Sequence, residues 1–447
     1  RDLHLSLRRQ RQMCIRDRII SVLILICIGT PISISLFSIG FLGIAALKQN
    51  FQIGIDSLSL IAQGTISEYV FATIPLFVLM GLFVSASEIG KDSFNLAHKV
   101  FGRIKGGLGV ATVAANAIFA AITGISIASA AIFSKIAVPE MIKNGYTGKF
   151  SAGLTAGSSV LGMLIPPSLL LIIYGVIAEV SIGSLFLAAI VPGLILAISF
   201  SIGVIIMSNI WPEFVGNLDN EEDCKPISFG EVVSSFLPLL ILILLVLGGI
   251  YGGIFTPTEA AGCGAMGALL LSLAYKKLTL PKLQEALVKT LEITALIMVL
   301  VAASNFFGAV FARLGTPTLL TEFLLGLEMN KYLILAMIMA MIFLLGWPLE
   351  WVPIVMIIIP IILPLVEALG FNLTWFAILV AVNLQTCWLS PPVALSAYFL
   401  KGVVPEWDLK DIYYGMMQFM VLQLIGLVLI VLFPQIALWL PTLLYGN

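Results

Sequence analysis

The sequence predicts an all-α polytopic membrane protein built from inverted repeats, and three observations lead to this fold class. Hydrophobic residues make up 60% of the 447 residues and charged residues only 11%, against about 25% charged residues in soluble domains. The apolar runs are long and continuous, which favours membrane helices over the short alternating strands of a barrel. Two double prolines, Pro166-Pro167 and Pro391-Pro392, are separated by an offset of 225 residues, which indicates an internal repeat.

The same composition excludes several functional classes. So much apolar surface cannot be buried in a soluble core, and a net charge of −1 argues against a nucleic-acid partner. The five cysteines lack metal-ligand spacing, and the chain contains only two histidines. It contains no P-loop, GxSxG or HExxH motif. We therefore expect no enzyme activity and no cofactor, and coupling to an ion gradient becomes the default energy source.

The membrane-spanning segments follow from the apolar runs, at about 20 residues for each crossing. Residues 51–65 form a weaker candidate, which is either a short span or an interfacial helix. Residues 1–18 carry six arginines, do not fit the rest of the chain and are excluded from the fold argument. The clear candidates are 19–40, 69–87, 183–208, 232–254, 258–275, 285–312 and 411–440.

Two further apolar regions, 107–142 and 331–366, are interrupted by Gly and Pro. Each is expected to form a re-entrant hairpin of two half-helices, with tips near 124–126 and 346–348. Each hairpin is followed by a helix broken at Pro-Pro, 150–178 in the first copy and 374–402 in the second. Counting the crossings between the copies gives them opposite orientations, which is the inverted-repeat architecture of secondary transporters.

Loop charges orient the chain. The side on which the first hairpin begins carries most of the basic loop residues, whereas the opposite side carries only Arg313 and Lys331. The positive-inside rule therefore places the first side in the cytoplasm. The basic residues of that side are Lys91, Lys99, Arg103, Lys105, Lys143, Lys149, Lys225, Lys276, Lys277, Lys282, Lys401 and Lys410.

Broken helices at membrane depth free carbonyl groups that can bind a cation, and a hairpin tip presents hydroxyls and a half-helix N-terminus that suits an anion. The first copy offers Ser and Thr at its tip, 123–129, and Gly and Ser at its break, 157–168. The second copy offers Asn383, Gln385, Thr386 and Ser390 before its double proline, and the offset aligns Ser158 with Asn383. Taken singly, such residues are ordinary helix-packing residues. As clusters at repeat-related positions, they favour an ion site with substrate beside it.

Charged and polar residues inside apolar segments are costly and need a reason. Lys135 and Glu140 are expected to pair with each other or to reach the membrane edge. Thr256 or Thr258 is expected to cap a helix whose first turn contains Glu259. Glu350, beside the second tip, either binds a cation or proton or faces external water.

Several motifs in the correct order resemble the large membrane subunit of TRAP (tripartite ATP-independent periplasmic) transporters, the DctM-like family. The resemblance covers about residues 19–440. The motifs are Val138-Pro139-Glu140-Met141 followed by Gly145-Tyr146, Ile165-Pro166-Pro167-Ser168, Leu185-Phe186 with Pro192-Gly193, Thr256-Pro257-Thr258-Glu259-Ala260-Ala261, and Leu389-Ser390-Pro391-Pro392-Val393 with Lys401-Gly402-Val403.

The resemblance implies an elevator-type, Na⁺-driven symporter that imports organic acids such as dicarboxylates across the bacterial inner membrane. It implies a small four-helix membrane subunit and a periplasmic substrate-binding protein as partners, besides membrane lipid. Carried over by motif, the first ion site falls on Gly124, Ser126, Ala128, Ser158, Gly162 and Pro166. The second falls on Gly346, Pro348, Thr386, Ser390 and Pro391. Substrate contacts are assigned to Ser126, Ser158, Asn383 and Thr386.

The expected division of the chain follows the repeats. After the basic tail 1–18, scaffold helices and a connecting arm occupy 19–105, and the first transport repeat occupies 106–210. An acidic loop and further scaffold helices occupy 211–330, and the second transport repeat with the last span occupies 331–447. Two other functions stay open: an elevator-type anion carrier that works without a binding protein, and a channel or membrane scaffold.

Overall fold

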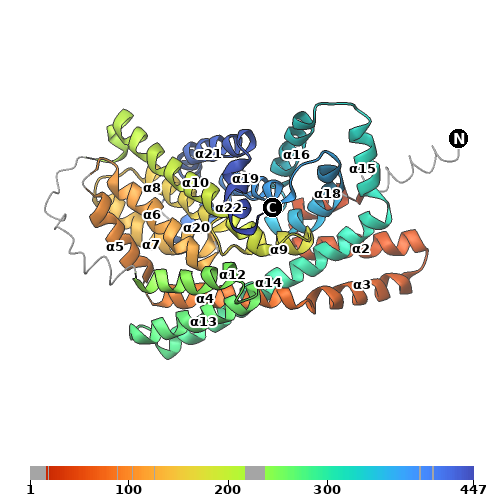
Figure 1. Cartoon of the computed structure of the whole chain (residues 1–447), viewed down its shortest axis with the longest axis horizontal. Helices are drawn as coiled ribbons and strands as arrows, with labels where there is room; N and C mark the ends of the chain where they lie inside the picture. The colour runs from red at the N-terminus through yellow and green to blue at the C-terminus, as the bar shows by residue number, and fades with distance from the viewer. Residues whose placement is uncertain are drawn as a thin grey trace. The chain divides into compact units, whose positions relative to one another are not determined.

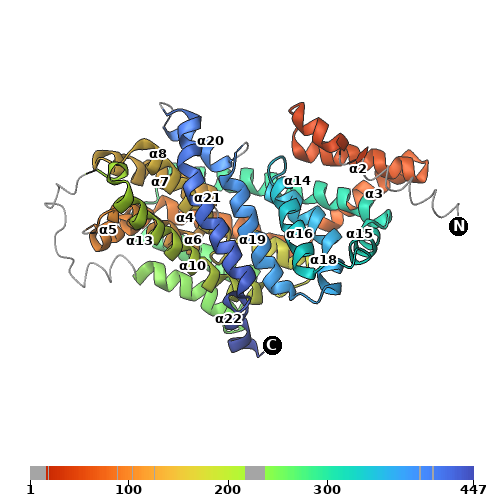
Figure 2. The same ribbon diagram turned by 90° about the horizontal axis from the view of Figure 1, so that it is seen from above.

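The computed structural model describes residues 17–18, 20–87, 89–102, 104–124, 126–216, 237–391, 394–404 and 407–446. Every regular element in these ranges is helical (Figures 1 and 2). The expectations for the basic tail up to residue 16, for Ile125, for Pro392 and for most of the acidic loop lie outside the described residues.

The elements run in the following order, with η1, η2 and η3 as 3₁₀ turns and η5 and η6 as π turns. They are α2 (Ile32–Lys48), α3 (Phe51–Ile66), η1 (Tyr69–Ala72), α4 (Thr73–Ala86), α5 (Ile89–Phe101), α6 (Gly107–Thr123), α7 (Ser126–Lys143), α8 (Gly148–Ser159), η2 (Val160–Met163), α9 (Leu169–Ile177), α10 (Ile182–Ile210), η3 (Pro212–Phe214), η5 (Leu244–Gly248), α12 (Gly249–Tyr251), α13 (Pro257–Ala274), α14 (Leu280–Arg313), α15 (Thr316–Leu325), α16 (Lys331–Leu345), α17 (Trp351–Pro353), η6 (Ile354–Ile358), α18 (Ile359–Ala368), α19 (Leu373–Leu389), α20 (Leu395–Val403), α21 (Leu409–Leu432) and α22 (Gln435–Tyr445).

Five helical segments in the described part are long and apolar enough to cross a membrane. They confirm the all-α polytopic membrane class. The five segments are Tyr69–Ala86, Ile182–Ile210, Leu280–Arg313, Trp351–Ala368 and Leu409–Leu432. The predicted spans 69–87, 183–208 and 285–312 each coincide with one of them.

Two predicted spans are divided by the structure. The segment 19–40 is interrupted at residues 28–31, and α2 begins only at Ile32. The segment 411–440 was expected to form one helix, but α21 ends at Leu432 and α22 begins at Gln435. Phe433 leaves the helical region with φ −124° and ψ 77°, directly before Pro434. A residue before proline is pushed out of the α conformation, and proline has no N–H to continue the helical hydrogen bonds.

The chain forms two compact units. Unit 1 comprises residues 1–71, 173–180 and 294–373, and unit 2 comprises 72–172, 181–293 and 374–447. In unit 1, Phe306 packs where Gly40 leaves room for its ring, and Asn305 Nδ2 donates a 2.6 Å hydrogen bond to Thr65 Oγ1. That bond supplies the polar partner that Asn305 needs inside an apolar helix.

Close helix contacts in unit 2 depend on glycine. Helices α8 and α21 pack so closely that a Cβ on Gly153 would collide with the backbone carbonyl of Gly415. Small residues at such positions let helix backbones approach each other, which is the usual source of van der Waals packing between membrane helices. Unit 2 therefore holds the first broken helix firmly against α21.

The expected helix cap is present at the start of α13. Thr256 Oγ1 accepts from the backbone N–H of Glu259 at 3.3 Å, and the Glu259 carboxylate accepts from the backbone N–H of Thr256 at 2.8 Å. The reciprocal pair is a capping box. This confirms that Glu259 serves a helix start and is not an isolated membrane charge.

Candidate ion and substrate site

The first predicted hairpin is formed by α6 and α7, which pack against each other on either side of Gly124. Gly124 ends α6 in the left-handed conformation, with φ 62° and ψ 13°. Left-handed backbone costs an L-residue about 1–2 kcal/mol, whereas glycine adopts it freely. Gly124 therefore permits the sharp reversal that makes the tip, and Ser126 and Ala128 follow it in the first turn of α7.

The first predicted helix break is also present. The α-helix α8 ends at Ser159, the 3₁₀ turn η2 covers 160–163, and α-helical structure resumes only at Leu169. The peptide bond between Pro166 and Pro167 is cis. Gly162 and Pro166 are buried at this break. Because proline donates no backbone hydrogen bond, the carbonyls of this segment are released from the helical pattern.

The hairpin tip and the helix break touch each other. A Cβ on Gly124 would collide with the carbonyl oxygen of Pro167 and would lie 3.6 Å from the Cα of Ser168. Ser168 Oγ donates a 2.5 Å hydrogen bond to the Met163 carbonyl, which closes the break on itself. The structure thus brings the tip and the break of the first copy to one place, although 42 residues separate Gly124 from Pro166 in the sequence.

Buried hydroxyls line the same part of unit 2. Ser126 and Ser129, in the first turn of α7, are 3% and 0% exposed, and neither Oγ hydrogen-bonds to another described residue. Ser158 Oγ accepts a 2.8 Å hydrogen bond from Asn116 Nδ2 and donates to the Leu154 carbonyl at 2.7 Å. A buried hydroxyl left without a partner costs about 1–3 kcal/mol. A bound ion or substrate group is one way to recover that cost.

The second broken helix reaches the first one through a chain of amides. Gln385 Nε2, on α19, donates a 2.9 Å hydrogen bond to the Val160 carbonyl at the first break. Gln423 Nε2, on α21, donates in turn to Gln385 Oε1. All of this network is buried. It holds α19 and α21 against the point where α8 loses its helical hydrogen bonds.

The remaining predicted site residues are divided between the units. Thr386 and Ser390 are buried near the end of α19, where their hydroxyls donate to the carbonyls of Val382 and Cys387 at 2.9 and 3.1 Å. Asn383 is 2% exposed on the same helix, and Pro391 directly follows Ser390 at the second break. These residues belong to unit 2.

Gly346 and Pro348 belong to unit 1, where they lie between α16 and α17 at the predicted second tip. Glu350 is the N-terminal cap residue of α17, beside Trp351. The predicted site residues of the first copy therefore share unit 2 with Asn383, Thr386, Ser390 and Pro391 of the second broken helix. The residues of the predicted second tip do not belong to that unit.

Two residues of the site were missed at the sequence level, namely Asn116 and Gln423. Each is an amide inside a helix that is otherwise apolar around it, and a polar side chain in such a helix usually has a functional or packing partner. An amide side chain within the apolar segments 107–123 and 409–432 was therefore a usable signal for Asn116 and Gln423. The partners themselves, Ser158 and Gln385, lie 42 and 38 residues away and could not be read from local sequence.

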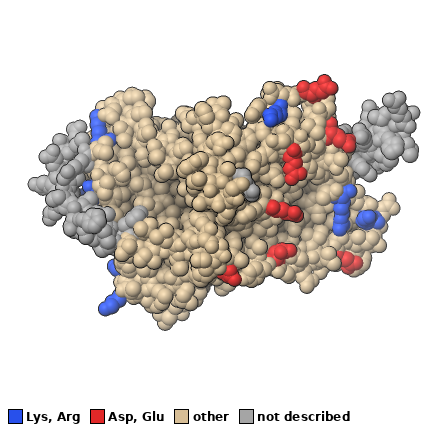
Figure 3. Space-filling view, in the orientation of Figure 1, with Lys and Arg blue, Asp and Glu red and all other residues tan. Residues whose placement is uncertain are grey.

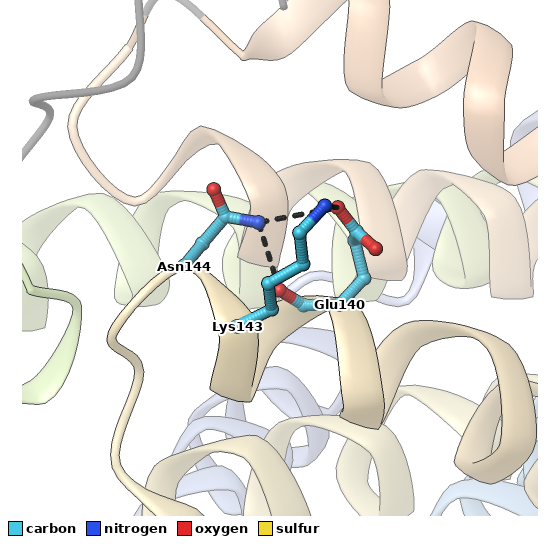
Figure 4. Close-up of polar contacts among 3 residues, drawn as sticks. All are labelled: Glu140, Lys143 and Asn144. Atoms are coloured by element: carbon cyan, nitrogen blue, oxygen red, sulfur yellow. Dashed lines mark hydrogen bonds and ion pairs between the residues drawn. The ribbon is translucent and has the colours of Figure 1, made fainter.

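The charges at the end of α7 pair differently from the sequence expectation. Glu140 Oε1 lies 3.7 Å from Lys143 Nζ and accepts a 3.3 Å hydrogen bond from Asn144 Nδ2, as Figure 4 shows. Lys135 is exposed one turn earlier. A neighbour one helical turn away competes better than one five residues away, because i,i+3 and i,i+4 side chains share a helix face. Of the two expectations for these residues, the Lys135–Glu140 pair is therefore wrong, and their reaching the membrane edge stays a prediction.

The donor set at the first tip and break consists of neutral oxygens. Among the residues that the structure describes, no three His, Cys, Asp or Glu side chains gather as a metal site. Hydroxyl and carbonyl oxygens are ligands for hard cations. The N-terminal end of α7 adds backbone N–H groups, which favour an anionic group. The arrangement can therefore hold a small hard cation beside a carboxylate.

A family model described as "Tripartite ATP-independent periplasmic transporter, DctM component" matches residues 19–436 of this chain. The sialic acid TRAP transporter large permease protein SiaM of Vibrio cholerae is 31% identical over 421 residues, which cover 94% of this chain and 96% of that protein. The C4-dicarboxylate TRAP transporter large permease protein DctM of Rhodobacter capsulatus is 30% identical over 436 residues, with 93% and 96% covered.

Two further similarities bear on assembly and fold. The isethionate TRAP transporter permease protein DctMQ of Oleidesulfovibrio alaskensis is 31% identical over 377 residues, which cover 84% of this chain but 58% of that protein. The crystal structure of the YdaH transporter of Alcanivorax borkumensis has a TM-score of 0.61 at 16% identity, covering 86% of this chain and 88% of that one. This second likeness concerns the fold alone.

Proposed function

Because this chain belongs to the DctM family of tripartite ATP-independent periplasmic transporters, we propose that it is the large permease of a sodium-driven importer of organic acids. The family consists of multi-pass membrane transporters and not of enzymes. Relatives that carry sialic acid, C4-dicarboxylates and isethionate indicate the substrate class, since all of these are organic acids. The location that follows is the bacterial inner membrane.

Two partners belong to this proposal. The DctMQ relative is longer than this chain, and its name joins the M and Q components in one protein. A separate small membrane subunit would take the Q role for this chain. A periplasmic binding protein would deliver the substrate, as the family name implies.

The single observation that best supports a coupling-ion site is the meeting of the first tip with the first break. Gly124 contacts the Pro167 carbonyl, and the Ser126 and Ser129 hydroxyls are buried nearby in the sequence without a hydrogen-bond partner among the described residues. We assign Na⁺ to the tip and break residues of the first copy, and the substrate carboxylate to Ser126 and Ser158. The second copy would supply Asn383, Thr386, Ser390 and Pro391 from α19 and its break.

The inverted repeat gains support from one hydrogen bond. Gln385 and Val160 are 225 residues apart, which is the same offset that relates the two double prolines, and the Gln385 amide donates directly to the Val160 carbonyl. Residues close to a two-fold axis contact their own symmetry equivalents. We infer that a pseudo-two-fold axis passes between the two broken helices, as inverted-repeat transporters require.

In the proposed elevator, the segments 106–210 and 331–447 carry the site and move against scaffold segments 19–105 and 211–330. Uptake tests the whole proposal. Vesicles containing this chain with its small subunit are expected to accumulate a cognate organic acid only with an inward Na⁺ gradient and the binding protein present. Uptake without the binding protein would favour the independent anion carrier, and non-saturating flux without Na⁺ would favour a channel.

Removing one oxygen from the tip tests the ion site. Ser126→Ala is expected to raise the Na⁺ concentration for half-maximal uptake at least tenfold. Losing a ligand oxygen is comparable to losing a hydrogen bond to a charged group, about 1.5–3 kcal/mol, and 1.4 kcal/mol is tenfold. If Ser126 only fills space, losing a partnerless buried hydroxyl should leave uptake unchanged or stabilise the protein.

Ser134→Ala is the matched control for Ser126→Ala. Ser134 is fully buried on the same helix, but its Oγ already donates to the Ala130 carbonyl at 2.5 Å. Its substitution should change Na⁺ dependence by less than twofold. Equal Na⁺ curves for both variants would remove Ser126 from the site.

A further inference from the structure

A hollow lies in unit 2 at the start of α8, whereas the helix break follows the end of that helix. The hollow has a volume of about 440 Å³ and is lined by the start of α8, by η3 and by the start of α21. Its wall combines an ion pair, Lys149 with Asp411, and the rings of Phe214, Trp407 and Tyr414. None of these residues has a role in the proposed transport site.

This cavity lies at one end of two membrane-spanning helices. Helix α10 ends at Ile210, directly before Trp211 and η3, and α21 begins at Leu409, directly after Trp407 and Asp408. Trp211 is 45% exposed and Tyr414 is 70% exposed. Tryptophan and tyrosine gather where membrane spans meet the headgroup layer. The cavity therefore opens at the depth of lipid headgroups.

The charges of the cavity form a dipole and not a patch of one sign. Lys149 Nζ lies 2.9 Å from Asp411 Oδ1, and the two side chains are 60% and 44% exposed. The Asp411 carboxylate raises the pKa of the Lys149 ammonium, because the ion pair stabilises its charged form.

Two charged neighbours of the cavity, Asp408 and Lys401, hydrogen-bond to backbone groups. Asp408 accepts from the backbone N–H of Lys410, and Lys401 Nζ donates to the Trp407 carbonyl. A purely anionic group would meet Lys149 with its charge already balanced. A group that carries a cation and an anion can pair with both members of the dipole.

Two further features suit such a zwitterion. Thr147, at the N-cap of α8, makes no side-chain cap bond, so the first backbone N–H groups of α8 are available to a phosphate beside Lys149. The Trp407 ring lies against Gly148, whose added Cβ would approach the indole to 3.1 Å, so the ring is held beside the same turn. Aromatic ring faces attract ammonium groups.

The surface leading away from the cavity is apolar. Residues 182–210 and 412–446 contain no charged residue, and Figure 3 shows a broad uncharged area over this part of the molecule with basic side chains at its left edge. Helices α10 and α21 pack together, with Gly203 against Leu422 and Gly426 against Leu196. Exposed side chains at helical spacing run along both: Leu194, Ile198, Ile202 and Ile206 on α10, and Val421, Ile425, Val428 and Leu432 on α21.

We propose that this cavity binds the headgroup of a zwitterionic phospholipid whose acyl chains lie along α10 and α21. The phosphate pairs with Lys149 and the start of α8, and the ammonium pairs with Asp411 and the rings of Trp407 and Tyr414. A phosphatidylethanolamine headgroup has this chemistry, whereas phosphatidylglycerol lacks the cation that Asp411 would hold.

Native mass spectrometry of the full chain tests the site, with lipid retention measured against added phosphatidylethanolamine or phosphatidylglycerol of identical acyl chains. The unmodified chain should retain phosphatidylethanolamine at least fivefold better. The double variant Lys149→Gln/Asp411→Asn should lose that preference while keeping the size of the pair. Trp407→Leu gives a second, independent perturbation and should weaken retention of phosphatidylethanolamine more than that of phosphatidylglycerol.

The pair Glu285–Lys289 provides the control. It is also an exposed ion pair, with a 2.5 Å separation, but it lies on α14 away from this cavity. Glu285→Gln/Lys289→Gln should leave the lipid preference within twofold. Equal retention of the two lipids by the unmodified chain, or an unchanged preference in both the Lys149/Asp411 and the Trp407 variants, would overturn the proposal.

Discussion

Gly124→Ala is expected to lower substrate uptake at least tenfold while the protein still inserts and folds. A Cβ at this position meets the Pro167 carbonyl, which is backbone and cannot rotate away. The tip or the break must therefore shift, and the oxygens at both places move with it. A displacement of about 1 Å at a site that positions reacting or bound groups can cost about a hundredfold in rate. The loss should appear in initial uptake rates at saturating Na⁺ and substrate.

Gly370→Ala separates this steric effect from simple backbone strain. Gly370 has φ +73°, close to the +62° of Gly124, but nothing lies within 4 Å of its added Cβ. In both variants, left-handed backbone at an alanine destabilises the fold by about 1–2 kcal/mol. Only Gly124→Ala also pushes the hairpin tip away from the helix break. If the two variants lose uptake equally at matched expression, the contact between tip and break has no role in transport.

The turn, the helix break and the helix cap could be predicted from the sequence, because each is encoded by a few adjacent residues. Gly124 marks the first reversal, Pro166-Pro167 the first break, and Thr256 with Glu259 a helix start. Glycine and proline act through backbone geometry, and a capping box acts within four residues. Such signals need no knowledge of the surrounding fold.

The sequence did not predict which polar residues meet. The offset of 225 aligned Ser158 with Asn383, whereas the side chain that hydrogen-bonds to Ser158 in the structure is that of Asn116, from the preceding hairpin. Gln385 was noted as polar, but its bond to the Val160 carbonyl depends on α19 lying against the break of α8. Tertiary packing sets these contacts, so they emerge only once the helices are placed. The same applies to Glu140, whose choice of Lys143 depends on side-chain direction along α7.

A disulfide between the first hairpin and α4 is expected to stop transport completely and reversibly. Gly81 lies on α4, in the proposed scaffold, and its added Cβ would be 3.1 Å from the Cβ of Thr123 at the end of α6. Disulfides join Cβ atoms about 3.5–4.5 Å apart, so Gly81→Cys/Thr123→Cys requires only a small outward shift. If the hairpin must slide past α4 to carry substrate across, a covalent link at this contact blocks every transport cycle.

The control is a disulfide placed within the proposed scaffold. Thr73 on α4 and Thr258 on α13 have their Oγ1 atoms 3.3 Å apart, so Thr73→Cys/Thr258→Cys should also cross-link. Both pairs are built in a background without the native cysteines, and uptake is measured after oxidation and again after reduction. The Gly81/Thr123 pair should lose uptake on oxidation and regain it on reduction, whereas the Thr73/Thr258 pair should transport in both states. Undiminished uptake by a fully cross-linked Gly81/Thr123 variant would mean that the hairpin and α4 keep their contact throughout transport, and a moving hairpin would then be untenable.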